Sequence, residues 1–144
     1  MPTVQDILAR KGSDVISVKP GETVLNAAQL MSERGIGGLV VTEGGRLVGI
    51  FTERDILRRV VAQRRDAGAT NVAEVMTTPV TACSPETPVE ECAAMMTEQR
   101  IRHLPVLNDR SLAGMITIGD VLAFQVREQQ ATIDYMHHFM FDLR

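Results

Sequence analysis

The sequence has few of the residues that mark secreted, disulfide-bonded or membrane-spanning proteins. Its 144 residues include two cysteines, no tryptophan and only 3% aromatic residues. No apolar run approaches the roughly 18 residues that cross a bilayer, and residues 1–6 do not resemble a signal peptide. Cys83 and Cys92 are not in a close metal-ligand or redox spacing, so we expect a reduced, cytoplasmic protein. Cys92 falls on the apolar face of an expected helix, and Cys83 is a candidate exposed thiol.

An excess of positive charge is also absent. The chain has 15 Lys and Arg against 18 Asp and Glu, a formal net charge of −3. A protein that neutralises the phosphates of a nucleic acid needs the opposite sign. We therefore expect no nucleic-acid partner and, without an apolar span, no membrane partner. The hydrophobic content of 44% and charged content of 23% are typical of a soluble globular protein.

What the sequence does contain is an internal duplication. Residues 24–57 aligned with residues 89–122, at a constant offset of 65, are identical at 12 of 34 positions. Unrelated stretches agree at roughly one position in twenty, so chance does not explain this similarity. The repeat occurs only twice and is too long for a small solenoid unit. Two copies that face each other across a pseudo-twofold axis are the simpler interpretation.

Apolar periodicity and turn residues predict the same order of elements in both copies, strand–helix–strand–strand–helix. In the first copy these elements cover residues 15–18, 23–35, 38–42, 47–51 and 53–63. In the second copy they cover residues 80–82, 89–96, 103–107, 112–116 and the chain from 118 onward. A short helix precedes each copy, at residues 4–8 and 72–76. We divide the chain into a first repeat (1–63), a linker (64–71), a second repeat (72–126) and a C-terminal helical extension (127–144).

The most regular part of the duplication is a corner where a strand ends and a helix begins. Gly49–Asp55 returns as Gly114–Asp120, so Thr and Asp recur at the same places in both corners. Open backbone N–H groups at a helix start attract anions, and a carboxylate can accept from both adjacent hydroxyls of a ribose. The alternative is structural, because Thr-x-x-Asp also caps a helix. Both copies keep Asp while the two residues between Thr and Asp change, which favours a ligand, and the two roles can coexist.

Together with the segment Arg100–Val106, the two corners and the order of elements resemble a pair of CBS domains, the modules named after cystathionine β-synthase. The resemblance covers roughly residues 4–126. It implies an α+β fold in which each repeat is a three-stranded sheet with two helices on one side. The two sheets pack face to face with pseudo-twofold symmetry, and an extended C-terminal helix follows. It also implies two clefts for adenosyl ligands such as AMP, ADP, ATP, NAD or S-adenosylmethionine.

The resemblance further implies which residues line the clefts. The Asp of one corner holds the ribose, its Thr helps to place ribose or phosphate, and the other repeat contacts the adenine. In the first cleft these residues are Thr52, Arg54, Asp55, Thr78, Val80, Arg102 and His103. In the second cleft they are Asp14, Ile16, Gly37, Gly38, Thr117 and Asp120.

The two clefts differ in charge. Arg54 and Arg102–His103 of the first cleft correspond to Gly119 and Gly37–Gly38 in the second. Charge-assisted hydrogen bonds to phosphate are the strong kind. We therefore expect the first cleft to bind phosphorylated adenine nucleotide more tightly, with AMP as the first candidate and ATP, ADP or NAD as alternatives. The second cleft is expected to be weaker or shaped for another adenosyl group.

No nucleophile with a base and an orienting partner is recognisable in the sequence, so we expect a non-enzymatic sensor that regulates a separate protein. Two alternatives stay open, a structural adaptor that has lost ligand binding and an enzyme of nucleotide turnover. Apolar side chains from Leu122 to Met140 continue along the last helix, which indicates a homodimer or a tail folded back on its own domain. Asp134 with His137 or His138 is an alternative candidate metal site.

Overall fold

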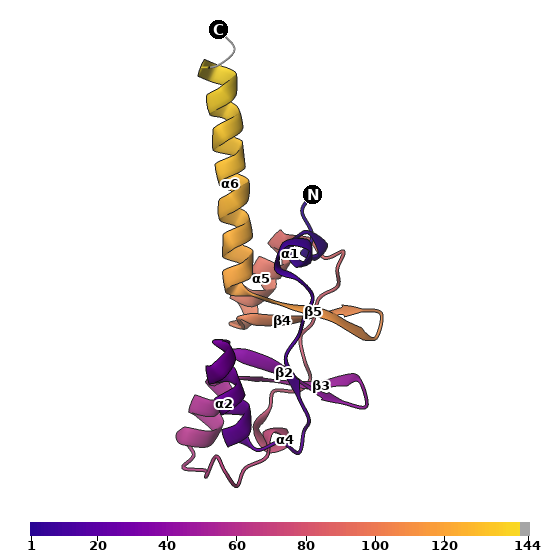
Figure 1. Cartoon of the computed structure of the whole chain (residues 1–144), viewed down its shortest axis with the longest axis vertical. Helices are drawn as coiled ribbons and strands as arrows, with labels where there is room; N and C mark the ends of the chain where they lie inside the picture. The colour runs from indigo at the N-terminus through magenta and orange to yellow at the C-terminus, as the bar shows by residue number, and fades with distance from the viewer. Residues whose placement is uncertain (142–144) are drawn as a thin grey trace.

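The computed structural model describes residues 1–141, which form two similar halves stacked along the long axis (Figure 1). The elements of the first half are β1 (Ser17–Val18), α2 (Val24–Arg34), β2 (Gly38–Glu43), β3 (Arg46–Thr52), α3 (Glu53–Asp55) and the π-helix η1 (Ile56–Val61), which continues α3. Its sheet has the order β1-β2-β3, with β1 parallel to β2 and β2 antiparallel to β3. Gly44 and Gly45 have φ angles of 58° and 77°, the positive values that a two-residue hairpin turn requires.

The second half repeats this plan with a smaller sheet. Its elements are α5 (Val89–Gln99), β4 (His103–Asn108), β5 (Ser111–Thr117) and α6 (Ile118–Phe141), and its sheet contains only β4 and β5. The strand predicted at residues 80–82 is therefore wrong, because these residues form no strand and the pairing there is reduced to an isolated bridge from Cys83 to Val106. In the first half the N–H of Val40 bonds to the carbonyl of Ile16. Pro105 takes the place of Val40 and has no N–H, so the equivalent ladder cannot extend.

The two cysteines lie in the core of the second half. The prediction of an exposed thiol at Cys83 is wrong, because this residue is only 8% exposed. The neighbouring thiol of Cys92, together with burial, raises the pKa of Cys83. A protonated, buried thiol is a poor nucleophile, so Cys83 acts as a small core residue.

The short helices that open the two halves are exchanged between them. α1 (Val4–Lys11) packs into the core of the second half, and α4 (Val72–Val75) packs into the core of the first. Equivalent backbone bonds fix both helices, since the N–H of Val4 donates to Thr87 and the N–H of Val72 donates to Glu22. In Figure 1, α1 accordingly lies with the upper half and α4 with the lower. The sequence-based division into 1–63, 64–71, 72–126 and 127–144 stays a prediction.

The halves meet around equivalent residues. Within each half, an equivalent backbone bond holds the corner at this junction, since the N–H of Glu53 donates to the carbonyl of Gly37 and the N–H of Ile118 donates to the carbonyl of Arg102, each at 2.9 Å. At the interface, a Cβ added to Gly38 would lie 3.0 Å from the imidazole of His103, the residue that corresponds to Gly38 at the offset of 65. The predicted arrangement of two facing repeats with pseudo-twofold symmetry is confirmed, and both strand-to-helix corners face this junction.

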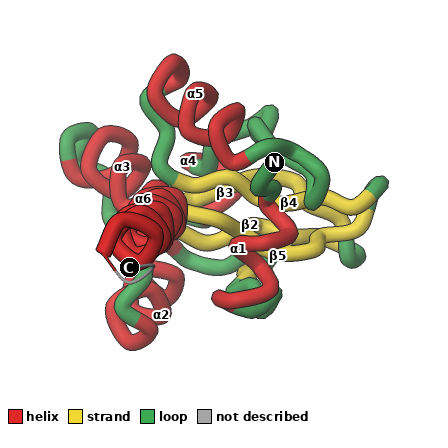
Figure 2. The backbone as a smooth tube through the Cα atoms, turned by 90° about the horizontal axis from the view of Figure 1, so that it is seen from above, coloured by secondary structure: helices red, strands yellow, loops and turns green. Residues whose placement is uncertain are grey.

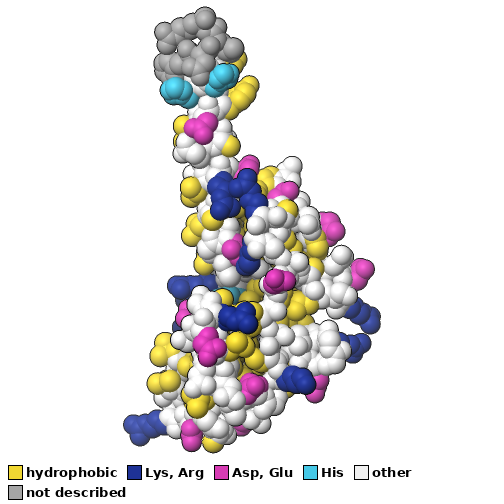
Figure 3. Space-filling model, in the orientation of Figure 1, with side chains coloured by type: hydrophobic (Ala, Val, Ile, Leu, Met, Phe, Trp, Pro, Cys, Tyr) yellow, Lys and Arg dark blue, Asp and Glu magenta, His cyan; other side chains and the backbone are white. Residues whose placement is uncertain are grey.

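Helix α6 leaves the body of the molecule and projects alone (Figure 1), and Figure 2 views this helix end-on. Ile133, Met136 and Met140 are 58%, 53% and 62% exposed, so the alternative of a tail folded back on its own domain is wrong for the described part of the extension. Hydrophobic side chains follow this helix in Figure 3. Residues 142–144 of the predicted extension lie outside the described residues. Within residues 1–141, no helix has the length and apolar character needed to cross a membrane.

Candidate functional site

One cavity, here called cavity one, lies between the corner of the first half and the start of β4. It measures about 240 Å³, with one wall from β3, α3 and η1 and the other from Ile101, Arg102 and His103. This volume is slightly below the roughly 300–1,000 Å³ usual for small-molecule sites. A groove of about 360 Å³ adjoins it, shares Arg54, Ile101 and Arg102 with it, and adds Arg100. A ligand larger than cavity one can therefore continue into this groove.

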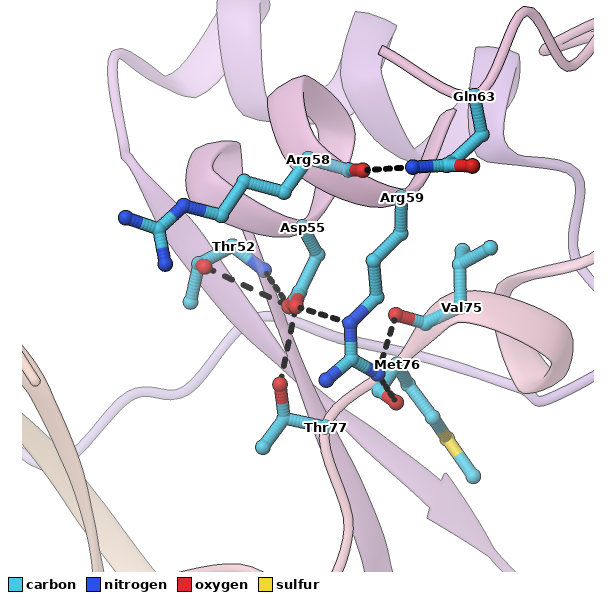
Figure 4. Close-up of polar contacts among 8 residues, drawn as sticks. All are labelled: Thr52, Asp55, Arg58, Arg59, Gln63, Val75, Met76 and Thr77. Atoms are coloured by element: carbon cyan, nitrogen blue, oxygen red, sulfur yellow. Dashed lines mark hydrogen bonds and ion pairs between the residues drawn. The ribbon is translucent and has the colours of Figure 1, made fainter. Parts of the chain in front are cut away.

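Asp55 is held firmly at the edge of cavity one (Figure 4). It is 5% exposed, and its Oδ2 accepts from the backbone N–H of Thr52 at 3.0 Å. Its Oδ1 accepts from the Thr77 hydroxyl at 2.9 Å and lies 3.7 Å from Nε of Arg59. The bond to Thr52 is the helix cap, so the capping alternative is confirmed at this corner. An ionised carboxylate has about four lone-pair sites, so a cap leaves room for a ligand contact.

Positive charge dominates cavity one. Four arginine side chains line it beside two carboxylates, those of Glu53 and Asp55. These arginines are Arg54, Arg58, Arg59 and Arg102. Arg59 is anchored because its Nη1 donates to the carbonyl of Met76 at 3.0 Å, and Arg54 donates to the carbonyl of Arg100. In Figure 4 the guanidinium of Arg58 points away from Asp55. This excess of guanidinium groups suits an anionic ligand such as a phosphate.

A second and larger cavity, cavity two, lies between the corner of the second half and the start of β2. Its volume is about 510 Å³. All six residues predicted for the second cleft line it, namely Asp14, Ile16, Gly37, Gly38, Thr117 and Asp120. The backbone N–H of Thr117 donates to Oδ2 of Asp120 at 2.8 Å, and the N–H of Asp120 donates to the Thr117 hydroxyl at 3.1 Å. The capping alternative is thus confirmed here too, beside a cavity.

Lys11 adds an ion pair to this second corner. Its Nζ lies 2.6 Å from Oδ2 of Asp120 and donates to the carbonyl of Met115 at 2.7 Å. Lys11 reaches this place because α1 packs against the second half rather than the first. Asp120 Oδ1 has no hydrogen-bond partner within residues 1–141, and the Asp120 side chain is 25% exposed. This oxygen can accept a hydrogen bond from a ligand.

His103 belongs to both cavities, as do Glu53 and Arg102. The imidazole is half-buried between Gly38 and the cavity walls. Burial lowers the pKa of His103, against an opposing effect of the Glu53 carboxylate. The side chain is therefore neutral at pH 7, and the fixed cation shared by the two cavities is Arg102.

The structure places most, but not all, of the predicted site residues on the cavities. Thr52, Arg54, Asp55, Arg102 and His103 line cavity one. Thr78 and Val80 do not belong to its lining within the described residues. Thr77 takes that place, because its backbone exchanges hydrogen bonds with Ile50 at 2.8 and 3.1 Å and so turns its hydroxyl toward Asp55. The roles of all these residues in ligand binding stay predictions.

Several lining residues were missed from the sequence. Arg59 lies four positions after Asp55 on one helix, a spacing that brings side chains together and could have indicated it. Lys11 carried no such signal, because its place depends on the exchange of α1.

The alternative candidate metal site involved Asp134. The Asp134 side chain accepts from Gln130 at 2.9 Å, and no group of three potential metal ligands occurs within residues 1–141.

The comparisons with known proteins agree with this architecture. The family model of the CBS domain matches residues 4–62 and 72–127, so the chain belongs to the CBS-domain family. It is 35% identical over 131 residues to the CBS domain-containing protein YhcV of Bacillus subtilis, covering 91% of each chain. A candidate signal-transduction protein with CBS domains from Burkholderia ambifaria is 43% identical, with a TM-score of 0.85 over 89% of this chain and 96% of that one.

A further solved structure contains ligands. It is the CBS domain pair of protein MJ0100 in complex with 5′-methylthioadenosine and S-adenosyl-L-methionine. That pair is 27% identical to this chain, with a TM-score of 0.79 over 89% of this chain and 98% of that one. The chain is therefore a pair of CBS domains of the kind found in regulatory proteins, and the predicted α+β fold is confirmed.

Proposed function

We propose that this protein is a non-enzymatic regulatory module that binds a phosphorylated adenine nucleotide in cavity one, with AMP as the first candidate and ADP, ATP or NAD as alternatives. The observation that carries the proposal is that four arginines line the same cavity as the Asp55 carboxylate. Guanidinium groups bind phosphate oxygens through paired, charge-assisted bonds. The phosphate then lies against Arg54 and Arg102, the ribose beside Asp55 and Thr52, and the base against the apolar side chain of Ile101.

The adenosyl part of the ligand is supported by the CBS pair of MJ0100, whose structure holds two adenosyl compounds. The phosphate part is supported by this chain's own arginines. The adjoining groove with Arg100 gives additional phosphates or a second nucleoside a positively charged path out of cavity one. The same site thus accepts ligands of different length, and their relative affinities are set by contacts with this groove.

Regulation follows from the place of cavity one between the two repeats. A ligand that contacts both halves favours the arrangement in which all its contacts are made, and it shifts the population by its difference in affinity for the two arrangements. The exposed helix α6 is the surface that reports this change to a separate protein in the cytoplasm. A second copy of the chain covers part of the same surface, so the regulated unit is a homodimer.

A structural adaptor is the second candidate, and one observation favours it. Asp55 already has a partner for each carboxylate oxygen inside the protein, as expected for a purely structural cap. Thermal unfolding separates the two candidates, because a ligand that binds the native state raises the unfolding temperature. An adaptor shows no shift with AMP, ADP, ATP, NAD or S-adenosylmethionine.

Isothermal titration with AMP tests the proposal directly. We expect Arg102→Met to weaken AMP binding at least about tenfold, the loss that follows from one charged hydrogen bond to phosphate. Arg46→Met is the matched control, because Arg46 is exposed at the far end of β3. Equal affinities for the two variants would contradict the assignment of cavity one. Nucleotide that is consumed during the titration would instead indicate an enzyme of nucleotide turnover.

A further inference from the structure

We propose that cavity two takes an adenosyl compound without phosphate groups, while phosphorylated nucleotide is confined to cavity one. This inference rests on the proposed function, because it assigns a ligand class to the second cavity of the same module. The two cavities share Glu53, Arg102 and His103. They differ in the charges that remain available to a ligand, and this difference selects the ligand.

Cavity two has a shortage of free positive charge. Three carboxylates line it, those of Asp14, Glu53 and Asp120. Of its two permanent cations, Lys11 is already bound to Asp120 and to the carbonyl of Met115. Arg102 is the cation that remains. A phosphate in cavity two would therefore meet more negative than available positive charge.

Arg102 cannot serve both cavities at once. In cavity one it acts with Arg54 and Arg58, besides Arg59 that is paired with Asp55, so a phosphate there engages it first. A second phosphate, in cavity two, would then face the carboxylate of Glu53. That carboxylate lies against Gly37, the residue that precedes β2, since a Cβ added to Gly37 would come within 2.9 Å of Glu53 Oε1. Occupation of cavity one by a nucleotide thus excludes a second phosphorylated ligand and leaves an uncharged nucleoside unaffected.

The carboxylate that contacts the ribose, in contrast, is more accessible in cavity two than in cavity one. The Asp120 side chain is 25% exposed with Oδ1 open, whereas that of Asp55 is 7% exposed with both oxygens engaged. A ribose gains more from the open carboxylate. Apolar side chains of Ile16 and Met115 line the same cavity and can contact a base. Cavity two therefore holds its ligand by the nucleoside, and cavity one holds its ligand by the phosphate.

Gly119 provides a gain-of-function test. It corresponds to Arg54 of cavity one, and a Cβ added to it would have its nearest neighbour, Thr117 Oγ1, at 3.5 Å, an ordinary contact distance. Isothermal titration of the full chain uses AMP and adenosine, which differ only in the phosphate. We expect the wild-type chain to bind one AMP, and Gly119→Arg to bind two. Gly119→Gln, which adds a side chain without charge, keeps one.

Asp120→Asn completes the test. It is expected to weaken adenosine binding at least about tenfold and to leave AMP binding unchanged. Two AMP molecules per wild-type chain, one of them lost in Asp120→Asn, would overturn the inference, and so would a stoichiometry of one in Gly119→Arg. Absence of AMP binding with Asp120-dependent adenosine binding would overturn the proposed function but keep the nucleoside site. Thermal unfolding of each variant verifies the fold, and Gly119→Arg remains decisive if Asp120→Asn does not fold.

Discussion

Lys11 Nζ lies 2.6 Å from Oδ2 of Asp120, although 109 residues separate them in the chain. The contact exists because α1 leaves its own repeat and packs against the other. The cation that pairs with the carboxylate of the second corner therefore comes from the first helix of the chain. The corresponding carboxylate, Asp55, is paired instead with Arg59 and Thr77. The duplicated corners have thus diverged in the partners of the same acid.

Replacing Lys11 by methionine tests what this ion pair does. Lys11→Met releases Oδ2 of Asp120, and we expect adenosine to bind about fivefold more tightly because the ribose no longer shares that oxygen with a cation. The free energy of unfolding should fall by at most about 1 kcal/mol, since the pair is partly exposed. Titration and urea unfolding measure the two effects. Arg10→Met is the control on the same helix, and weaker adenosine binding in Lys11→Met would contradict the prediction.

The two corner aspartates should differ in their contribution to stability. Asp55→Asn disturbs a buried carboxylate with bonds to Thr52 and Thr77 and an ion pair to Arg59, so we expect a loss of about 1–3 kcal/mol. Asp120→Asn affects a more exposed side chain and should cost less than about 1 kcal/mol. Urea unfolding without ligand compares the two variants. Similar losses would show that burial does not distinguish the corners.

Much of the fold could be predicted because the duplication exposes it. Twelve identities in 34 positions align α2, β2, β3 and α3 with α5, β4, β5 and the start of α6, and the positions of Gly35 and Gly44–Gly45 mark a helix end and a turn. The exchange of α1 could not be predicted, since Val4, Ile7 and Leu8 suit either core equally well. The missing strand at 80–82 had a visible cause in Pro105, which matters only once the pairing partner of that strand is known.

The candidate site was predictable where it repeats and was missed where it does not. Thr52, Asp55, Thr117 and Asp120 recur at the fixed offset, and all four line a cavity. Thr78 and Val80 have no such support, and the bridge between Thr77 and Ile50 moves the contact to Thr77. Periodicity identifies shared geometry, whereas the charges that make the two cavities different come from non-repeated residues.

His103 should make stability depend on pH. Burial lowers its pKa in the folded protein below the unfolded value near 6.5, with Lys11 and Arg102 acting in the same direction and Glu53 and Asp120 opposing them. Because the unfolded chain then binds more protons, this contribution to stability is complete above pH 6.5 and decreases as pH falls toward the lowered value. Urea unfolding from pH 7 to 5.5 should show a steeper loss for wild type than for His103→Gln. If wild type and His103→Gln lose stability equally as the pH falls, a group other than His103 causes the pH dependence.

The surface expected to bind a second copy repeats with the fold. Leu57 and Val61 of η1 correspond to Leu122 and Val126 of α6 at the offset of 65. All four are exposed, at 61%, 63%, 54% and 62%. The same side of α6 continues beyond the body through the exposed residues Ile133, Met136 and Met140. Two copies of the chain related by a twofold axis can cover these surfaces symmetrically, because each copy supplies the same residues.

Leu122→Glu should therefore dissociate the proposed homodimer. Burial of a leucine stabilises an interface by about 1.5–3 kcal/mol, and a symmetric dimer loses this contact twice, so the dissociation constant should rise about a hundredfold or more. Sedimentation equilibrium measures the change. Ala131→Glu is the matched control, because residue 131 lies about two and a half turns from Leu122 and so faces the opposite side of α6. A wild-type monomer, or equal dissociation of both variants, would mean that another partner covers this surface.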